Sequence, residues 1–214
     1  MILLTAARMP EGLDKDTLAM TVLLLFPSPE NEEYIEKLRS KTHTPSACES
    51  LFALALVYEQ LRELTGCVGD TSNLILARNK MGKPYFKDSD IRFNVSHSKG
   101  YVVSAVSVGE ELGVDVEASN ITPERAERFA KRYFSDQEQS EILNSPELFA
   151  RKWTEKEARA KFLGKSVENI LSQDKTSTGP RSFDDIYLHQ FSIDGHPITL
   201  CTKRDFSTIS FTVQ

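Results

Sequence analysis

The sequence is poor in cysteine and in positive charge, and each shortage disfavours a class of protein. Its three cysteines, Cys48, Cys67 and Cys201, are odd in number and form no Cys-x-x-Cys pair. This spacing favours neither a disulfide framework nor a zinc site, and it is typical of a reducing cytoplasm. The formal net charge of −5 is opposite in sign to that of proteins that track phosphate backbones. We therefore expect no nucleic-acid partner, and we expect any anion to be bound locally.

Long apolar runs are also missing. The longest, residues 2–7 and 20–26, are too short to span a bilayer, and the N-terminus lacks the basic lead of a signal peptide. We therefore expect a cytoplasmic protein without a membrane partner. With 214 residues, 40% of them hydrophobic, the chain is able to bury a core and lies between one large domain and two small ones.

The order of the expected elements indicates an α+β fold. Hydrophobic periodicity and capping signals predict strands at 2–7, 73–77, 93–96, 101–108 and 112–117, two or three more strands after residue 183, and helices at 14–25, 44–66, from 122 onward and at 146–163. The second half repeats the order of the first without a sequence repeat, which suggests two similar α+β halves. Residues 79–90 and 166–181 are expected loops, the second of them exposed.

A pair of acids lies on one expected strand, in the segment LGVDVE. The period of two places Asp115 and Glu117 on one face, with Cα atoms roughly 7 Å apart. The other face carries Leu112, Val114 and Val116 and is expected to join the core. Two carboxylates in one small volume are unfavourable without a cation, and Mg²⁺ takes such ligands together with phosphate oxygens. The alternative is a solvated strand edge that carries two acids.

A second candidate lies in the helical segment RKWTEKEARAKFLGK. Trp153, Glu157 and Lys161 are spaced four apart, so a carboxylate and an ammonium share one stripe of the helix with an aromatic ring beneath them. The alternative is a surface ion pair between Glu157 and Lys161, with Trp153 in the core.

Two further candidates precede the acidic strand. His97 stands between two serines in FNVSHSKG, at the end of an expected strand. An imidazole in this setting, followed by Lys99 and Gly100, suits phosphate binding, and the alternative is a hydrogen-bonded structural histidine. Lys83 lies in the turn GKP, where the alternative is a solvated loop lysine.

These segments together resemble the Sfp-type 4′-phosphopantetheinyl transferases. G-K-P, F-N-V-S-H-S, G-V-D-V-E and W-T-E-K-E-A-R-A-K follow one another between Gly82 and Lys161 in the family's order and spacing. The resemblance implies an enzyme, a holo-[acyl-carrier-protein] synthase. Such an enzyme uses Mg²⁺ to transfer the 4′-phosphopantetheine arm of coenzyme A to a serine of an apo acyl or peptidyl carrier protein, and it releases 3′,5′-ADP.

The resemblance also implies an architecture. Two similar α+β halves would be related by a pseudo-twofold axis within a monomer. Residues 1–110 would form the N-terminal half, which contributes to coenzyme A binding. Residues 111–214 would form the C-terminal half, which carries the metal site.

The same resemblance implies roles for single residues. Three acids match the family's magnesium ligands: Asp115, Glu117 and Glu157. Lys161 matches its lysine on the coenzyme A pyrophosphate, His97 its phosphate-contacting histidine, and Lys83 the lysine of its nucleotide-binding loop. Catalysis is expected from Glu157, as the base that takes the serine proton directly or through water, and from Lys161, which stabilises charge on the leaving phosphate.

One position departs from the family pattern. Many relatives place an arginine for the 3′-phosphate near the start of the second helix, where this chain has Glu49, in capping-box spacing with Ser46. We expect this capping box to give Glu49 a structural role, and we expect other cations to meet the 3′-phosphate. The candidates are Lys37, Arg39, Lys41, Arg78 and His97.

The segment ITPERAERFAKRYF predicts a basic, partly apolar helix in an acidic protein. Arg125, Arg128 and Arg132 recur at helical spacing, and the resemblance implies that the carrier protein docks there. The alternative is an ordinary amphipathic helix whose Glu124 and Glu127 balance the charge.

Two other functions stay open. Another Mg²⁺-dependent enzyme acting on phosphodiesters, such as a nuclease, uses the same acids and lysines. Its acid and lysine usually lie two apart on a strand, whereas Glu157 and Lys161 have helical spacing. A non-catalytic carrier-binding relative would have lost a metal ligand, and this chain has all three acids.

Overall fold

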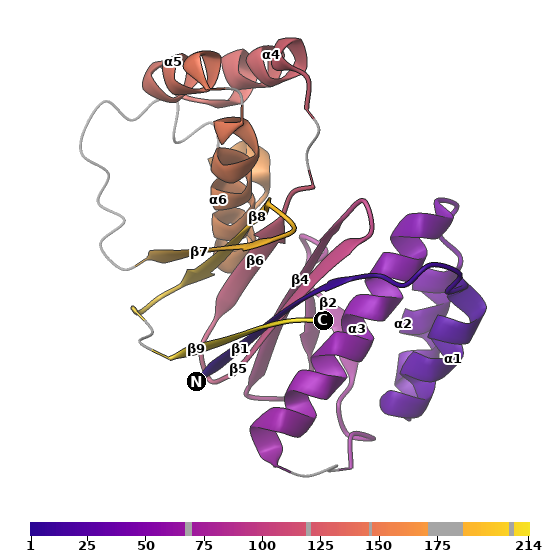
Figure 1. Cartoon of the computed structure of the whole chain (residues 1–214). Coiled ribbons are helices and arrows are strands. Elements are labelled where there is room, and N and C mark those ends of the chain that lie inside the picture. The colour runs from indigo at the N-terminus through magenta and orange to yellow at the C-terminus, as the bar shows by residue number, and fades with distance from the viewer. Residues whose placement is uncertain (67–69, 119–120, 146, 171–185, 206–207) are drawn as a thin grey trace.

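The computed structural model describes residues 1–66, 70–118, 121–145, 147–170, 186–205 and 208–214. Within these residues, helices pack against mostly antiparallel sheets (Figure 1), which confirms the predicted α+β class. The elements are β1 (Ile2–Arg8), α1 (Lys15–Leu25), α2 (Pro29–Arg39), α3 (Thr44–Thr65), β2 (Leu76–Arg78), β3 (Pro84–Phe86), β4 (Ile91–Ser98), β5 (Tyr101–Val108), β6 (Leu112–Val116), α4 (Pro123–Tyr133), α5 (Asp136–Asn144), α6 (Leu148–Leu163), β7 (Tyr187–Ile193), β8 (His196–Thr202) and β9 (Ile209–Val213).

The first half is built on a four-stranded sheet in the order β4-β5-β1-β9. β5 pairs antiparallel with both β4 and β1, whereas β9 lies parallel to β1. The long helix α3 packs against β5 and β4, and α1 and α2 cover its outer side (Figure 1). The core between these helices and the sheet contains Phe26, Leu51 and Leu54, which are almost fully buried.

The second half contains a three-stranded antiparallel sheet in the order β6-β8-β7, with α6 packed on β6 and β8. α4 and α5 lie beyond this sheet, at the top of Figure 1. Each half thus lays a long helix on a sheet, while a pseudo-twofold axis and a boundary after residue 110 remain predictions. The last strand, β9, pairs with β1 and so belongs to the sheet of the first half.

The junction of the two halves runs between β4 and β6. Asn94 is 2% exposed, and its side-chain oxygen accepts a hydrogen bond of 2.8 Å from the backbone N–H of Val114. At Gly113, an added Cβ would lie 2.2 Å from the backbone oxygen of Ala158 and 2.4 Å from the backbone nitrogen of Phe162. Only glycine therefore allows α6 to approach β6 this closely.

Two helices were missed in the sequence. α2 follows the helix expected at 14–25 and begins with Ser28 as the N-cap and Pro29 in the first turn, because proline is tolerated at a helix start. α5 begins with a capping box formed by Ser135 and Glu138. The expected loop at 79–90 contains the short strand β3, which pairs with β2.

None of the described helices is both long enough and apolar enough to cross a membrane. Cys48 and Cys201 are buried free thiols, and burial raises the pKa of Cys201 to about 12. Cys67 and most of the loop expected at 166–181 lie outside the described residues.

Candidate active site

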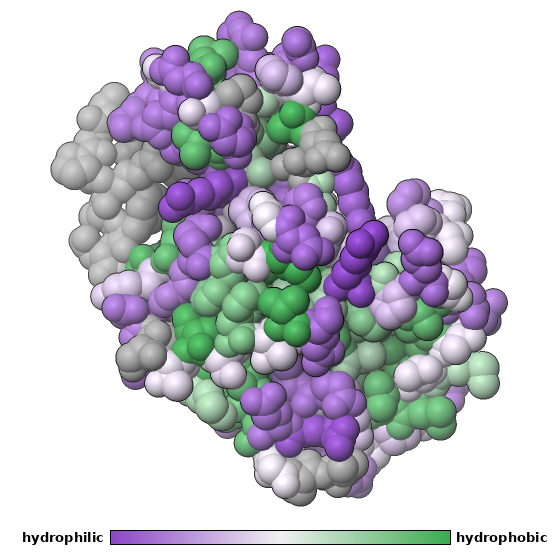
Figure 2. Space-filling model, viewed as in Figure 1, coloured by the Kyte–Doolittle hydropathy of each residue, from purple (hydrophilic) through white to green (hydrophobic). Residues whose placement is uncertain are grey.

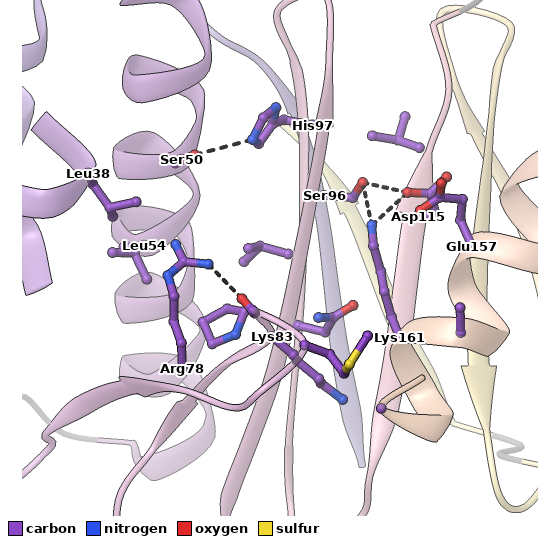
Figure 3. Close-up of a pocket in the computed structure, with 18 of the residues that line it drawn as sticks. Leu38, Ser50, Leu54, Arg78, Lys83, Ser96, His97, Asp115, Glu157 and Lys161 are labelled. Atoms are coloured by element: carbon purple, nitrogen blue, oxygen red, sulfur yellow. Dashed lines mark hydrogen bonds and ion pairs between the residues drawn. The ribbon is translucent and has the colours of Figure 1, made fainter. Parts of the chain in front are cut away.

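A cavity of about 430 Å³ lies where the two halves meet. Six residues singled out in the sequence line it: Lys83, His97, Asp115, Glu117, Glu157 and Lys161. Figure 3 shows Ser50 and His97 on one side of the cavity and Asp115 with Lys161 on the other. The structure therefore brings the predicted site residues of both halves to one place.

The side chains on the two faces of strand β4 point toward different neighbours. Ser96 Oγ donates a hydrogen bond of 2.6 Å to Asp115 Oδ1, and Ser98 Oγ donates one of 3.2 Å to Glu117 Oε1. Asn94, two residues before Ser96, holds the same neighbouring strand. The alternating polar side chains of β4 thus point at β6 and its acids. His97 lies on the opposite face, so it does not belong to this row.

Asp115 and Lys161 form the centre of the acidic end of the cavity. Lys161 Nζ lies 2.7 Å from Asp115 Oδ1, and it also donates to Ser96 Oγ at 2.9 Å and to the Val114 carbonyl at 3.2 Å. Asp115 is 5% exposed, so this ion pair is largely removed from water. In place of the surface ion pair with Glu157 that was the alternative in the sequence, Lys161 of α6 pairs with Asp115 of β6.

Glu157 and Glu117 face the same end, beside Asp115 (Figure 3 labels Glu157). Burial raises the pKa of Glu157 to about 7, and the Asp115 charge adds to this effect while Lys161 opposes it. Burial and Asp115 likewise raise the pKa of Glu117. Protonation is favoured at both groups because the end of the cavity holds more carboxylate charge than Lys161 balances.

The donor set at this end fits a hard divalent cation. Across the described ranges, no three His, Cys, Asp or Glu side chains are clustered tightly enough to hold a metal as they stand. The side chains nevertheless supply three carboxylates, which are the ligands that Mg²⁺ prefers. Raised pKa values at Glu117 and Glu157 are the behaviour of a carboxylate cluster without its cation.

Lys83 reaches the cavity from the turn between β2 and β3. Its ammonium is paired with Glu111 and donates a hydrogen bond of 2.8 Å to the Leu112 carbonyl. Burial lowers the pKa of Lys83, and Glu111 opposes the shift. These contacts tie the turn to the start of β6.

The opposite end of the cavity is rich in cations. His97 Nδ1 lies 2.8 Å from Glu49 Oε2, and His97 Nε2 lies 3.2 Å from Ser50 Oγ. Lys41 Nζ donates a hydrogen bond of 3.0 Å to the same Ser50 Oγ. Arg78 lines this end as well, with its guanidinium 5.2 Å from the centre of the Tyr34 ring.

The capping box expected for Glu49 is wrong. His43 is the N-cap of α3 and accepts from Ser46 N–H at 3.2 Å, which places Ser46 inside the helix. Glu49 instead accepts from His97 and, at 2.6 Å, from the backbone N–H of Gly100. Burial raises the pKa of Glu49, but these two hydrogen bonds outweigh it and the net pKa is lowered. This partnership joins residues 47 or more positions apart, and spacing along one helix does not reveal it.

The basic helix α4 packs on α6 through aromatic rings. The cluster contains Phe129, Tyr133, Phe134, Phe149 and Trp153. A side pocket of about 270 Å³ lies between Arg125, Lys99 and these rings, and it shares Glu117 and Trp153 with the main cavity. In Figure 2 the surface over α4 and α5 is mostly hydrophilic. The α4 surface is thus continuous with the acidic end.

A family model described as the 4′-phosphopantetheinyl transferase superfamily matches residues 111–213. Among curated proteins, "4′-phosphopantetheinyl transferase AcpT" of Escherichia coli O157:H7 is 32% identical over 142 residues, which cover 63% of this chain and 69% of that protein. "4′-phosphopantetheinyl transferase" of Bacillus subtilis is 29% identical over 167 residues, which cover 75% of this chain and 70% of that protein.

The "4′-phosphopantetheinyl transferase gsp" of Aneurinibacillus migulanus is 37% identical over 100 residues, which cover 44% of this chain. This match spans 40% of the relative's length, and two further relatives are matched over 40% and 41% of theirs.

Proposed function

This chain belongs to the 4′-phosphopantetheinyl transferase superfamily, and from that premise we propose that it transfers the 4′-phosphopantetheine arm of coenzyme A to a serine of an apo carrier protein. The observation that carries the proposal is the approach of α6 to β6, which places Glu157 and Lys161 beside Asp115 in one cavity. The names of the relatives in three bacteria support the same reaction.

In the proposed reaction, the serine oxygen forms a bond to the phosphorus that carries pantetheine, and the bond from this phosphorus to the bridging pyrophosphate oxygen breaks. 3′,5′-ADP leaves with the bridging oxygen. Glu157 takes the serine proton directly or through water. Lys161, held by Asp115 and Ser96, stabilises charge that develops on the leaving phosphate.

Asp115, Glu117 and Glu157 would hold a magnesium ion at this end. When bound, such an ion supplies positive charge to the pyrophosphate oxygens. The three carboxylates also orient the neighbouring groups: Asp115 fixes Lys161, and Glu117 fixes the end of β4 through Ser98.

Coenzyme A binding is assigned to Lys83 and His97 together with Lys161. Lys83 fixes the turn between β2 and β3 at the rim of the cavity. The carrier protein is expected to approach over α4, because the side pocket beside Arg125 opens toward Glu117. We expect the enzyme to act as a monomer in the cytoplasm.

The test is incubation of the protein with coenzyme A, Mg²⁺ and an apo carrier protein, followed by intact mass of the carrier. The expected result is a mass increase of one phosphopantetheine group together with release of 3′,5′-ADP. The same mixture with EDTA should leave the carrier unmodified. Carrier that stays unmodified in Mg²⁺ would contradict the proposal and would favour a non-catalytic carrier-binding protein. Release of nucleotide without carrier modification would favour another phosphodiester-processing enzyme.

A further inference from the structure

Behind His97, next to the cationic end of the cavity, lies an acid, Glu49, which is 6% exposed. By its charge alone, a carboxylate in this position would oppose anion binding. If repulsion were its main effect, neutralising Glu49 would strengthen the binding of a phosphate there. The hydrogen bonds around His97 indicate the opposite.

Ser50 Oγ is contacted by three groups at this end. It lies 2.7 Å from the Ser46 carbonyl oxygen, 3.0 Å from Lys41 Nζ and 3.2 Å from His97 Nε2. His97 and the Lys41 ammonium therefore face the same oxygen.

The other ring nitrogen is fixed by Glu49. Nδ1 lies 2.8 Å from a carboxylate oxygen, and a carboxylate only accepts, so Nδ1 carries a proton. Glu49 therefore fixes the orientation of the imidazole ring and leaves Nε2 facing Ser50.

The groups at this end suit a phosphate monoester, which carries a charge of about −1.5 to −2 at pH 7. Lys41 and Arg78 line the cavity with positive charge, and His97 lines it beside them. Lys41 Nζ and His97 Nε2 converge on one oxygen, Ser50 Oγ, so they face a common point in the cavity.

Glu49 also fixes the backbone that carries His97. Its second oxygen accepts from Gly100 N–H at 2.6 Å, at the turn between β4 and β5. Lys99 in this turn has a positive φ of 49°, a conformation that is costly for a residue with a side chain. One carboxylate therefore holds both the imidazole and the strained turn next to it.

We propose that Glu49 is a positioning residue, which holds His97 and the neighbouring turn so that the ring is aimed to bind the 3′-phosphate of coenzyme A together with Lys41 and Arg78. The inference rests on the proposed function, since it assigns one phosphate of that substrate to the cationic end. It gives Glu49 a favourable effect on anion binding, exerted through His97.

The test compares two ligands that differ only in the 3′-phosphate, namely 3′,5′-ADP and 5′-AMP, by calorimetric titration. The wild-type protein should bind 3′,5′-ADP at least about tenfold more tightly, as expected for charge-assisted hydrogen bonds. In Glu49→Gln, one amide oxygen replaces two carboxylate oxygens, so the side chain no longer accepts from both His97 Nδ1 and Gly100 N–H. The affinity ratio should fall by about tenfold.

The control is Glu59→Gln, on the same helix, where Glu59 pairs with Arg62 away from the cavity. It should leave the ratio at the wild-type value. If Glu49→Gln does not fold, Glu49→Asp keeps the charge but is too short to hold both His97 and Gly100, and its ratio should also fall. A ratio that rises or stays constant in the folded Glu49 variant would overturn the proposal, as would a wild-type ratio near one.

These outcomes are separable from failure of the proposed function. A protein that modifies the carrier while Glu49→Gln keeps the wild-type ratio retains the transferase function and loses this inference. A protein that never modifies a carrier but shows the expected fall in the ratio retains the phosphate site and loses the transferase function.

Discussion

The two ends of the cavity have opposite charge, and each is accompanied by a residue of the other sign. At the acidic end Lys161 is held beside Asp115, Glu117 and Glu157, and at the cationic end Glu49 lies behind His97. Burial and Asp115 raise the pKa of Glu157, and Lys161 offsets only part of this shift. Glu49 instead fixes the position of His97 and of the adjacent turn. Lys161 thus balances charge at one end, whereas Glu49 holds a binding group in place at the other.

The largest expected effect comes from removing a carboxylate from the acidic end. Glu157→Gln keeps the shape of the side chain but removes the base and one carboxylate charge, so kcat/KM for carrier modification should fall by about 10²–10⁴-fold. The measurement is the rate of carrier modification by intact mass. Glu155→Gln, on the same helix but paired with Arg151, should retain the wild-type rate. Near wild-type activity in Glu157→Gln would remove this residue from the reaction.

The substitution Gly113→Ala should disrupt the acidic end and leave the cationic end intact. The new Cβ collides with the backbone of α6, so the helix must shift away from β6. Overpacking of this kind should lower the free energy of unfolding by about 1–3 kcal/mol and abolish transfer. Binding of 3′,5′-ADP at the cationic end should persist, since His97 and Ser50 lie on β4 and α3. Unfolding by urea and calorimetric titration measure the two effects, and wild-type stability would show that α6 tolerates the shift.

Measurements of stability over a range of pH test the protonation of Glu157 at the acidic end. The folded pKa of Glu157 is raised from 4.5 to about 7, so the folded protein holds a proton that the unfolded chain releases between these values. The stability of the metal-free protein should therefore be highest below about pH 4.5 with respect to this group, and it should fall until about pH 7.

Glu157→Gln should remove this loss, so its stability relative to wild type should increase by about 1–3 kcal/mol between pH 4 and pH 8. Urea unfolding in EDTA at each pH provides the comparison. A constant difference between the two proteins across this range would mean that Glu157 titrates normally.

The smallest expected effect concerns α4, outside both ends. Arg125→Glu with Arg128→Glu should raise KM for an acidic carrier by about 3–10-fold and flatten its salt dependence, because rim charges act mainly on association. Arg62→Glu, on α3 beside Glu59, is the control for added negative charge. Carrier kinetics that are unchanged in the double variant would place the docking surface elsewhere.

Much of the acidic end could be predicted from sequence. The strand period correctly put Leu112, Val114 and Val116 in the core, and all three are at most 2% exposed. It also put Asp115 and Glu117 together on the other face. The packing of α6 could not be predicted, because the requirement for Gly113 appears only when the backbone of a helix 45 or more residues later lies against it.

The cationic end could not be predicted in the same way. Its groups come from the segment after α2, from α3, β2 and β4, and no single period connects them. In FNVSHS, alternation along the strand places His97 on the face opposite Asn94 and Ser96. Strict use of the strand period at His97 would have revealed this separation.

The division of the cavity into two ends is tested most directly by calorimetric titration with coenzyme A and with 3′-AMP, each in Mg²⁺ and in EDTA. Coenzyme A carries a pyrophosphate for the acidic end, so its affinity should fall at least about tenfold when Mg²⁺ is removed. 3′-AMP has only the phosphate for the cationic end, and its affinity should be the same in both solutions. Equal dependence of the two ligands on Mg²⁺ would contradict the account.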